Sequence, residues 1–547
     1  MNPQDAQQRS WSFVLVPPLA VAIGLRLLGL DRQILVDDEL HAVHAALTLP
    51  IDEIVATWQF GHADYGVPMA ALYRGLMDAG VGFSEWTFRI PSLLAGLLAV
   101  IVLPPLASAR IGRRAAIALA WLIAVSPMLV FYSRIVRPYM MTAFLVACAV
   151  LLLDRFRQRG QRWAALGTFF AAALAIYHHL AAAPAVAGMF FFQALLPARE
   201  NARPQPRHVI MLGLATALGA SLLLLPGMAS LRDVIAHTRD GTPPGATTWL
   251  AVTQLQLGTA SAWLAIAAAL VALRGAAVLV RHQGSFGLYL VAVVACQVVG
   301  LLVLAPDRFD ERMVLNRYLL VVLPLLLLSI GVGATAPWWP GQGARARRIE
   351  TGVAVAALAL LVVAGPLGRA SYRESSFSHM LTSLDFTGDG NRMPLAATPP
   401  FYTGLAAFDG RPIIEYPWQN MSAHAFDAYQ RVHGQPVYVA SVIDRSDEPR
   451  LALRNRVEPL PEAMLASPAH YVVVHLDLES EARQMSSSDP SFEQWLRARE
   501  KLWLPLHRAG RAMERRLRQA FGPPAYADPK IVVWDLERAR RQGNPER

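Results

Sequence analysis

Three consecutive carboxylates, Asp37, Asp38 and Glu39, follow the first long apolar run of this chain. Like charges this close repel one another, so the group favours uptake of a proton. A carboxylate poised in this way suits a general base, which takes the proton from an attacking hydroxyl. The acidic start of a solvated helix explains the same residues, because Asp and Glu are favourable near helix N-termini. The sequence leaves both readings open.

Arginines at the ends of apolar runs form a second group. Arg134 and Arg137, followed by Tyr139, lie between two such runs, and Arg317 directly precedes a later one. A guanidinium can bind phosphate through two parallel hydrogen bonds. Anchoring to lipid headgroups explains Arg134, Arg137 and Tyr139 as well. A loop with internal salt bridges accounts equally for Arg317.

Histidines supply the remaining candidates. His178 and His179 are adjacent near the end of an apolar run, and neighbouring helical residues point to different faces, so the two rarely share one metal. We interpret His178 as a satisfied interfacial histidine and expect His179 to face the carboxylates. Glu39, His62 and His179 are candidate ligands of a divalent metal, although their spacing matches no known metal motif.

The composition indicates that these residues belong to a membrane protein. Hydrophobic residues make up 54% of the 547 residues and charged residues 16%, whereas a soluble chain carries about 25% charged residues. Most of the chain is therefore expected in lipid, which excludes a cytosolic enzyme, a disordered protein and a fibrous one. The net charge of +10 does not indicate nucleic acid, because the excess lies in short loops beside apolar runs.

Apolar runs long enough to cross a bilayer predict an all-α polytopic membrane fold of about eleven helices. The first outer loop, 31–90, contains three amphipathic segments at 40–49, 52–60 and 69–79, which we expect to lie along the interface. The predicted spans are 11–30, 91–109, 115–131, 140–153, 163–182, 183–196, 209–230, 262–280, 286–305, 319–336 and 350–368.

The loops between these spans differ in charge. One set carries 15 arginines in about 54 residues, and the other carries 10 in 112. By the positive-inside rule, the denser set and the N-terminus are cytoplasmic, and the segment after residue 368 is outside. Within the spans, Arg26 and Arg274 lie close to the ends, where we expect their side chains to reach the interface.

The tail, 369–547, has a different composition and predicts a soluble α/β domain on the periplasmic side. Two domains follow, a transmembrane domain over 1–368 and this tail. The helical spacing predicts helices over 422–432 and 491–521. The strand-like stretches are 412–416, 437–443, 471–476 and 531–534.

Taken in order, these pieces resemble the polytopic glycosyltransferases of the GT-C class. The most similar branch contains the protein O-mannosyltransferases and the aminoarabinose transferases that modify lipid A (glycosyltransferase families 39 and 83). The resemblance covers about residues 15–335, and the tail is similar only in position and type. The residues that carry it are Asp38-Glu39, the passage 82–92 with Arg89, Ser126-Pro127, Ser133-Arg134, Arg137-Pro138-Tyr139, His179, and Arg317-Tyr318 with Pro324.

The resemblance implies an inverting transfer of a sugar from a polyprenyl-phosphate-linked donor to a lipid, glycan or protein acceptor. Asp38 would be the base, with Asp37 and Glu39 as alternatives. Some relatives bind a divalent metal near the donor phosphate, and no nucleotide cofactor is expected. The residues expected to bind the donor phosphate are Arg137, Arg134, Arg317, Arg89 and Tyr139.

A transporter or a sensor could share some of these features. A polyprenyl-phosphate transporter or flippase also needs phosphate-binding arginines, but it does not need the Asp38-Glu39 pair. A solute transporter would place charges near the bilayer midplane, and a sensor would not need eleven spans. Lys501 and Lys530 are the only lysines, which suggests a GC-rich bacterial genome and hence the inner membrane of a bacterium. The expected partners are the lipid donor, the acceptor and membrane lipids, without nucleic acid.

Overall fold

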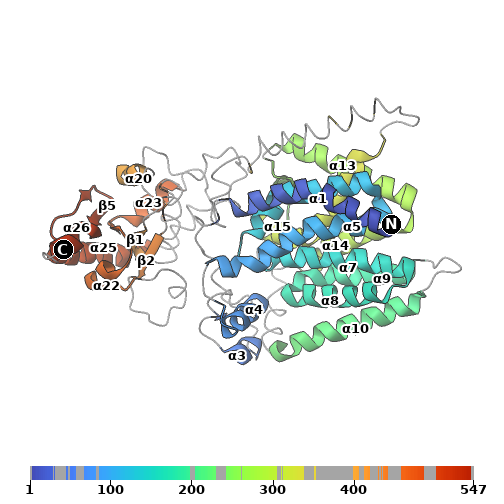
Figure 1. Ribbon diagram of the computed structural model, residues 1–547, viewed down its shortest axis with the longest axis horizontal. Helices are drawn as coiled ribbons and strands as arrows, with labels where there is room; N and C mark the ends of the chain where they lie inside the picture. Colours follow the sequence, from blue (N-terminus) through green and yellow to red (C-terminus); the bar gives the residue numbers. More distant parts are fainter. Residues whose placement is uncertain are drawn as a thin grey trace. The chain divides into compact units, whose positions relative to one another are not determined.

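The computed structural model contains two compact units, one formed by helices of the first 368 residues and one mainly by the tail (Figure 1). Each unit is described by itself below. The residues that the structure describes are 3–28, 30, 45–46, 50–56, 67–81, 85–196, 204–228, 242–259, 261–304, 309–310, 312–337, 346, 350, 352, 367, 398–405, 412–418, 429, 433, 435, 437–441, 457–485 and 500–543.

The first unit is built from helices that run alongside one another. Among them, α7 packs on α8, α8 packs on α10, and α9 packs on both α10 and α14 (Figure 1). Their bounds are α1 (Pro3–Leu27), α3 (Ile51–Ala56), α4 (Val67–Asp78), α5 (Glu85–Val125), α6 (Pro127–Ser133), α7 (Tyr139–Arg159), α8 (Arg162–His178), α9 (Ala183–Leu195), α10 (Pro206–Leu224), α12 (Ala246–Leu257), α13 (Ala262–Gln283), α14 (Ser285–Leu304), α15 (Arg312–Leu319) and α16 (Leu323–Thr335), with the 3-10 turns η3 (Leu180–Ala182), η4 (Leu225–Gly227) and η5 (Leu320–Val322).

Six helices in the described part of the chain are long and apolar enough to cross a membrane. One of them, Thr87–Val125, contains a break at Gly112, whose φ of 77° is not helical. An unbroken helix of that length would extend about 60 Å, twice the hydrocarbon thickness. This one helix therefore corresponds to the two predicted spans 91–109 and 115–131. The number eleven stays a prediction, and span 350–368 lies almost wholly outside the described residues.

Two arginines of this unit, Arg26 and Arg274, donate to main-chain carbonyls. Arg26 is fully buried and donates to Ser133 Oγ at 3.0 Å and to the carbonyl of Ala124 at 3.1 Å. Arg274 donates to the carbonyls of Ala336 and Pro337, just after α16. The expectation that these side chains snorkel is therefore wrong for Arg26. Carbonyls near helix C-termini carry partial negative charge and accept hydrogen bonds from both guanidinium groups.

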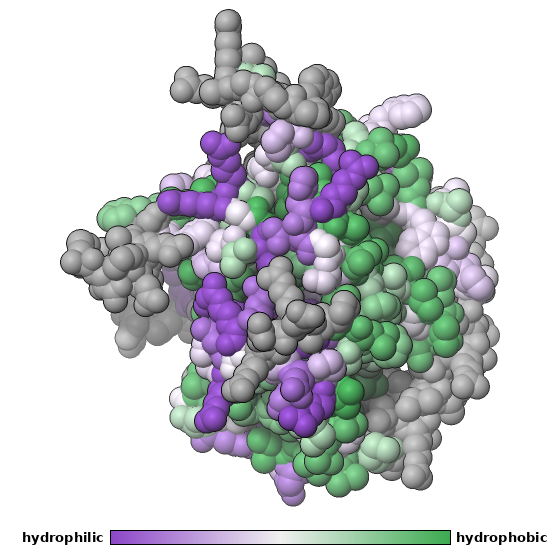
Figure 2. Space-filling model, turned by 90° about the vertical axis from the view of Figure 1, so that its right-hand side faces the viewer, coloured by the Kyte–Doolittle hydropathy of each residue, from purple (hydrophilic) through white to green (hydrophobic). Residues whose placement is uncertain are grey.

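The outer surface of the helical unit is largely apolar. Large side chains such as Leu214, Leu218 and Leu222 on α10 are more than half exposed, as lipid-facing residues are. In the view of Figure 2, hydrophilic residues gather in the centre of one face and hydrophobic residues flank them. Inside the unit, α13 and α16 approach so closely that a Cβ on Gly275 would lie 1.8 Å from the carbonyl oxygen of Ser329. Small residues permit such close packing in membranes.

The second unit is an α/β unit around a five-stranded mixed sheet with the order β2-β1-β3-β5-β4. The strands β2, β1 and β3 are parallel, β5 runs antiparallel to β3, and β4 runs antiparallel to β5. Strands lie at all four predicted positions, and β4 was not predicted. The bounds are α20 (Pro400–Leu405), β1 (Ile413–Trp418), β2 (Val437–Ser441), α22 (Pro461–Ala466), β3 (Tyr471–His475), α23 (Leu478–Met485), α25 (Glu500–Phe521), β4 (Tyr526–Ala527), β5 (Ile531–Asp535) and α26 (Leu536–Gly543).

The two faces of this sheet bury different residues. On one face, Val472, Val474 and Trp534 pack against Met513 and Leu517 of α25 in an apolar core. Because side chains alternate along a strand, Glu415 of β1 and His475 of β3 point to the opposite face. Both are almost completely buried there. The sheet is thus covered on both sides, and its second face contains a buried charged cluster.

Candidate functional site

A short break between α6 and α7 positions the predicted arginines. Ser126 caps α6, and Pro127 occupies its first turn, as is favourable at a helix start. The helix ends at Ser133, and α7 begins at Tyr139 after Pro138. The backbone between them turns, with the amide of Arg137 donating to the carbonyl of Ile135 at 2.9 Å. The break brings the Arg137 side chain over the ring of Tyr139, 5.8 Å from its centroid.

A second break places His179. Helix α8 ends at His178, and His179 is extended, with φ −158° and ψ 114°. Its Nδ1 accepts the backbone N–H of Ala181 at 3.1 Å, at the start of η3. A ring nitrogen that accepts a hydrogen bond carries no proton, so the ring is neutral and its proton is on Nε2. His179 therefore has one N–H donor available for a further partner.

These two breaks and the last turn of α15 meet in one aromatic and cationic group. The His179 ring lies 5.2 Å from the ring of Tyr139 and 5.5 Å from the ring of Tyr318. The guanidinium groups of Arg137 and Arg317 are both close enough to act electrostatically on His179. His179, Arg137, Arg317 and Tyr318 are half-buried, so they remain accessible. We call Arg137, Tyr139, His179, Arg317 and Tyr318 the arginine–histidine cluster.

Gln297 of α14 connects the two segments that carry this cluster. Its amide nitrogen donates to the carbonyl of Ala181 at 2.7 Å and to that of Tyr318 at 3.1 Å. Its amide oxygen accepts the N–H of Ala185 at 3.2 Å. The side chain is fully buried. Gln297 thus holds the turn after His179 against the segment that contains Arg317 and Tyr318.

The charge of the cluster suits an anion. Two guanidinium groups and one neutral imidazole N–H offer donors at the half-buried end of apolar helices, where a charge interacts more strongly than in water. Arg–phosphate contacts are among the strongest charge-assisted hydrogen bonds. A metal cation bound to His179 would instead be repelled by Arg137 and Arg317. In the described part of the chain, no group of three His, Cys, Asp or Glu residues could bind a metal ion.

The other predicted phosphate-binding residues lie in different surroundings. Arg134 is buried, and its Nη1 donates to the carbonyls of Leu25 at 3.2 Å and Leu28 at 2.9 Å, at the end of α1. Arg89 is buried near the start of α5. Of the predicted phosphate-binding set, the structure thus brings Arg137, Tyr139 and Arg317 together. Arg134 holds α1 in place beside them.

Several predicted residues lie outside the described residues, namely the carboxylates Asp37, Asp38 and Glu39 and the candidate metal ligand His62. Two further residues belong to the site. Tyr318 is part of the Arg317-Tyr318 motif but was not predicted to bind the phosphate, and Gln297 was not predicted at all. Gln297 is an amide inside an otherwise apolar run, and a polar group within a predicted span often has a specific role.

Comparison with known proteins finds a family model that matches part of the chain. Residues 65–223 match the model of the family Dolichyl-phosphate-mannose-protein mannosyltransferase. The resemblance to the GT-C glycosyltransferases is confirmed. The matched segment includes Arg137, Tyr139 and His179, but it ends before Arg317. No curated relative matches the chain by sequence.

Solved structures with a similar chain course have low sequence identity. The archaeal oligosaccharyltransferase AglB from Archaeoglobus fulgidus, in complex with an inhibitory peptide and a dolichol-phosphate, is 12% identical, with a TM-score of 0.45 over 89% of this chain and 72% of that one. The same organism's oligosaccharyltransferase in complex with Zn and sulfate is also 12% identical, with a TM-score of 0.41 over 88% and 71%. ArnT from Cupriavidus metallidurans bound to undecaprenyl phosphate is 14% identical, with a TM-score of 0.44 over 96% and 98%.

Two coarser statements follow. The chain is a mostly helical, multi-pass membrane protein, and the family that it matches is a family of glycosyltransferases.

Proposed function

We propose that the chain is an inverting glycosyltransferase that moves a sugar from a polyprenyl-phosphate-linked donor to a lipid, glycan or protein acceptor. We place the reaction at the outer face of a bacterial inner membrane, with the N-terminus in the cytoplasm and the tail in the periplasm. The observation that carries the proposal is the convergence of Arg137 and Arg317 on His179. The matching family is a second support.

The cluster would bind the donor phosphate. In the proposed reaction, an acceptor oxygen forms a bond to the anomeric carbon while the bond from that carbon to the phosphate oxygen breaks. Arg137 and Arg317 neutralise the charge that grows on the departing phosphate. His179 contributes its Nε2–H as a third donor to the same phosphate.

The proton of the acceptor hydroxyl goes to a carboxylate of the first outer loop. We assign this role to Asp38, with Asp37 and Glu39 as the alternatives. General base catalysis of this kind contributes about 10²–10⁴-fold. A divalent metal bound by Glu39, His62 and His179 does not fit the described surroundings of His179, so no step is assigned to a metal.

The test separates transfer from lipid transport. The full chain in detergent is incubated with polyprenyl phosphate, and the bound lipid is measured by native mass spectrometry. We expect Arg137→Gln and Arg317→Gln each to weaken binding at least tenfold, because each removes a charged phosphate contact. The control is Arg114→Gln, an exposed arginine with the same change of charge. Unchanged binding in both cluster variants contradicts the phosphate site.

The second part tests the chemistry. Asp38→Asn should leave lipid binding intact and remove transfer of sugar from a polyprenyl-phosphate-linked donor. Retained turnover in Asp38→Asn with loss in Asp37→Asn or Glu39→Gln moves the base to that residue. If the carboxylate variants bind and release lipid as before, and wild type shows no transfer with any donor, the lipid transporter becomes the better explanation.

A further inference from the structure

Helix α25 of the tail unit has two unlike sides. Trp503, Leu506, Met513 and Leu517 are buried with at most 2% exposure, and they recur at helical spacing. The opposite side carries Arg508, Arg511 and Arg515, all exposed, beyond Leu504, which is 53% exposed. Positions 504, 508, 511 and 515 follow the i, i+4, i+7, i+11 pattern, so they form one stripe along the helix.

The arginines of this stripe lack acidic partners in the described part of the chain. Nearby arginines are satisfied: Arg518 pairs with Glu514 at 3.0 Å, and Arg540 donates to three main-chain carbonyls. No such pair exists for Arg508, Arg511 or Arg515 among the described residues. Residues 500–543 carry ten Lys and Arg against five Asp and Glu, so the surroundings do not neutralise the stripe.

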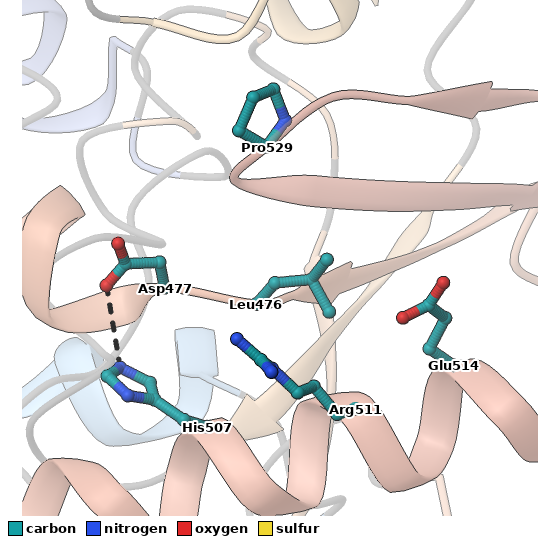
Figure 3. Close-up of a pocket in the computed structure, with 6 residues that line it drawn as sticks. All are labelled: Leu476, Asp477, His507, Arg511, Glu514 and Pro529. Atoms are coloured by element: carbon teal, nitrogen blue, oxygen red, sulfur yellow. Dashed lines mark ion pairs between the residues drawn. The ribbon is translucent and has the colours of Figure 1, made fainter.

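Arg511 also lines a groove of about 520 Å³ between α25, the end of β3 and the β4–β5 turn (Figure 3). Two acids line the same groove, but each has a partner, since Asp477 lies 3.6 Å from His507 and Glu514 pairs with Arg518. In Figure 3, Arg511 extends into the groove between them without an ion pair. The groove therefore presents an unneutralised guanidinium next to polar walls.

We propose that this side of α25 docks on the bilayer surface, with Arg508, Arg511 and Arg515 contacting the phosphates of anionic phospholipids. Leu504 inserts at the boundary between headgroups and acyl chains. Arginines close to an anionic membrane surface are attracted to it, and the exposed Leu504 at one end of the stripe supplies an apolar side chain that can enter the headgroup region. The chain itself spans the membrane, so a lipid surface is always within reach of its tail.

The test uses the full chain in lipid nanodiscs. A nitroxide label is attached at Leu504→Cys in a Cys148→Ala, Cys296→Ala background, which removes both native cysteines. Its collision rates with oxygen and with a water-soluble nickel chelate report whether the label lies in lipid or in water. In nanodiscs with phosphatidylglycerol, we expect high oxygen and low nickel accessibility. In nanodiscs of phosphatidylcholine alone, the label should return to water.

Charge variants identify the contacts. Arg508→Gln with Arg515→Gln should weaken docking about 25-fold, because each arginine near an anionic surface contributes roughly a fivefold factor. The matched control is Arg538→Gln with Arg541→Gln on α26, which removes the same charge from exposed positions. Proteolysis midpoints in urea must equal wild type for both variants, which shows that the tail is folded.

Three outcomes overturn the proposal. In the first, the label stays in water with both lipids. In the second, the two double variants weaken docking equally, which means that docking depends only on the net charge of the tail. The third is that a soluble acidic polysaccharide immobilises the label while anionic lipid does not, which assigns the stripe to an acidic polymer.

Discussion

Two histidines of this chain have opposite charge states, and their surroundings explain the difference. His179 accepts a backbone N–H at Nδ1, and Arg137 and Arg317 are close enough to disfavour a second proton on its ring, so it is neutral. His475 donates from Nε2 to Glu415 at 2.6 Å and from Nδ1 to Glu481 at 3.0 Å, so it carries a proton on both nitrogens. The first histidine is fixed as a donor for an anion. The second is itself the cation that two carboxylates require.

The two rings also differ in their exposure to solvent. His179 is half-buried, with one unassigned donor, whereas His475 is 1% exposed and enclosed by aromatic side chains. Tyr402 donates to Glu415 at 3.0 Å, and Tyr429 donates to Glu481. The ring of Tyr402 stacks on that of Tyr429 at 4.2 Å. We call the group around His475 the closed cluster and the arginine–histidine cluster the open cluster, because His179 retains a side-chain donor that a ligand can reach.

The largest effect is expected where the closed cluster loses its cation. His475→Ala leaves Glu415 and Glu481 buried without a positive partner, which costs about 3–5 kcal/mol. We expect the urea midpoint for proteolysis of the tail in the full chain to fall accordingly. The control is His507→Ala in the same unit, where the ion pair with Asp477 is partly exposed and contributes less than about 1 kcal/mol. Equal midpoints for wild type and His475→Ala would contradict a stabilising role.

The next effect concerns the support of the open cluster. Gln297→Leu removes the hydrogen bonds to the carbonyls of Ala181 and Tyr318, and the cost is about 2 kcal/mol. Thermal unfolding of the membrane unit should shift, and binding of polyprenyl phosphate should weaken with it. The control is Val299→Ala on the same helix, a side chain that is 57% exposed on the outer surface. If Gln297→Leu loses no more binding than the control, Gln297 does not support the phosphate site.

The sequence could predict some of these elements and not others. Period-two apolar stretches located β1, β2, β3 and β5, because a strand pattern is local. The cluster around His475 could not be found, because Glu415 lies 60 residues away and meets it only through the pairing of β1 with β3. The only signal in the sequence was a histidine, His475, in an otherwise apolar strand.

The membrane unit shows the same limit for arginines. The sequence identified Arg134 and Arg137 as a pair, because they are three residues apart at the end of a span. It could not separate their roles, since the carbonyls of Leu25 and Leu28 that bind Arg134 carry no mark in the sequence. Only the fold shows that Arg134 is engaged and that Arg137 faces Tyr139 and His179.

A smaller effect, with a defined sign, is the pH dependence of the tail. Burial alone lowers the pKa of His475, but Glu481 and Glu415 raise it to about 10, from 6.5 in the free residue. The folded state therefore binds this proton more tightly, and its contribution is complete below pH 6.5 and is lost as the pH rises through about 10. The pKa of Glu415 is also raised, chiefly by burial, which acts in the same direction.

The free energy of unfolding of the tail should thus fall between pH 7 and 10, by at most about 1.4 kcal/mol per pH unit for one group. The urea midpoint should fall with it. The side chains that contact the ring of His475 include Glu415, Glu481, Tyr402 and Tyr429. The pKa of both tyrosines is raised, chiefly by burial. His475→Ala should flatten the profile. A wild-type profile that is flat over this range would contradict the charged state.

The smallest effect tests the open cluster and depends on the proposed function. His179→Phe keeps an aromatic ring between Tyr139 and Tyr318 but removes the Nε2–H, so polyprenyl phosphate should bind about tenfold more weakly. His179→Gln loses the ring but supplies an amide donor, and it should recover part of that affinity. If the ring only packs, the order reverses, and Phe binds better than Gln. If the ring binds a metal, both variants bind alike, and added Zn²⁺ strengthens lipid binding in wild type alone. The order of these two variants therefore distinguishes a donor to phosphate from a packing residue or a metal ligand, even where the absolute changes are small.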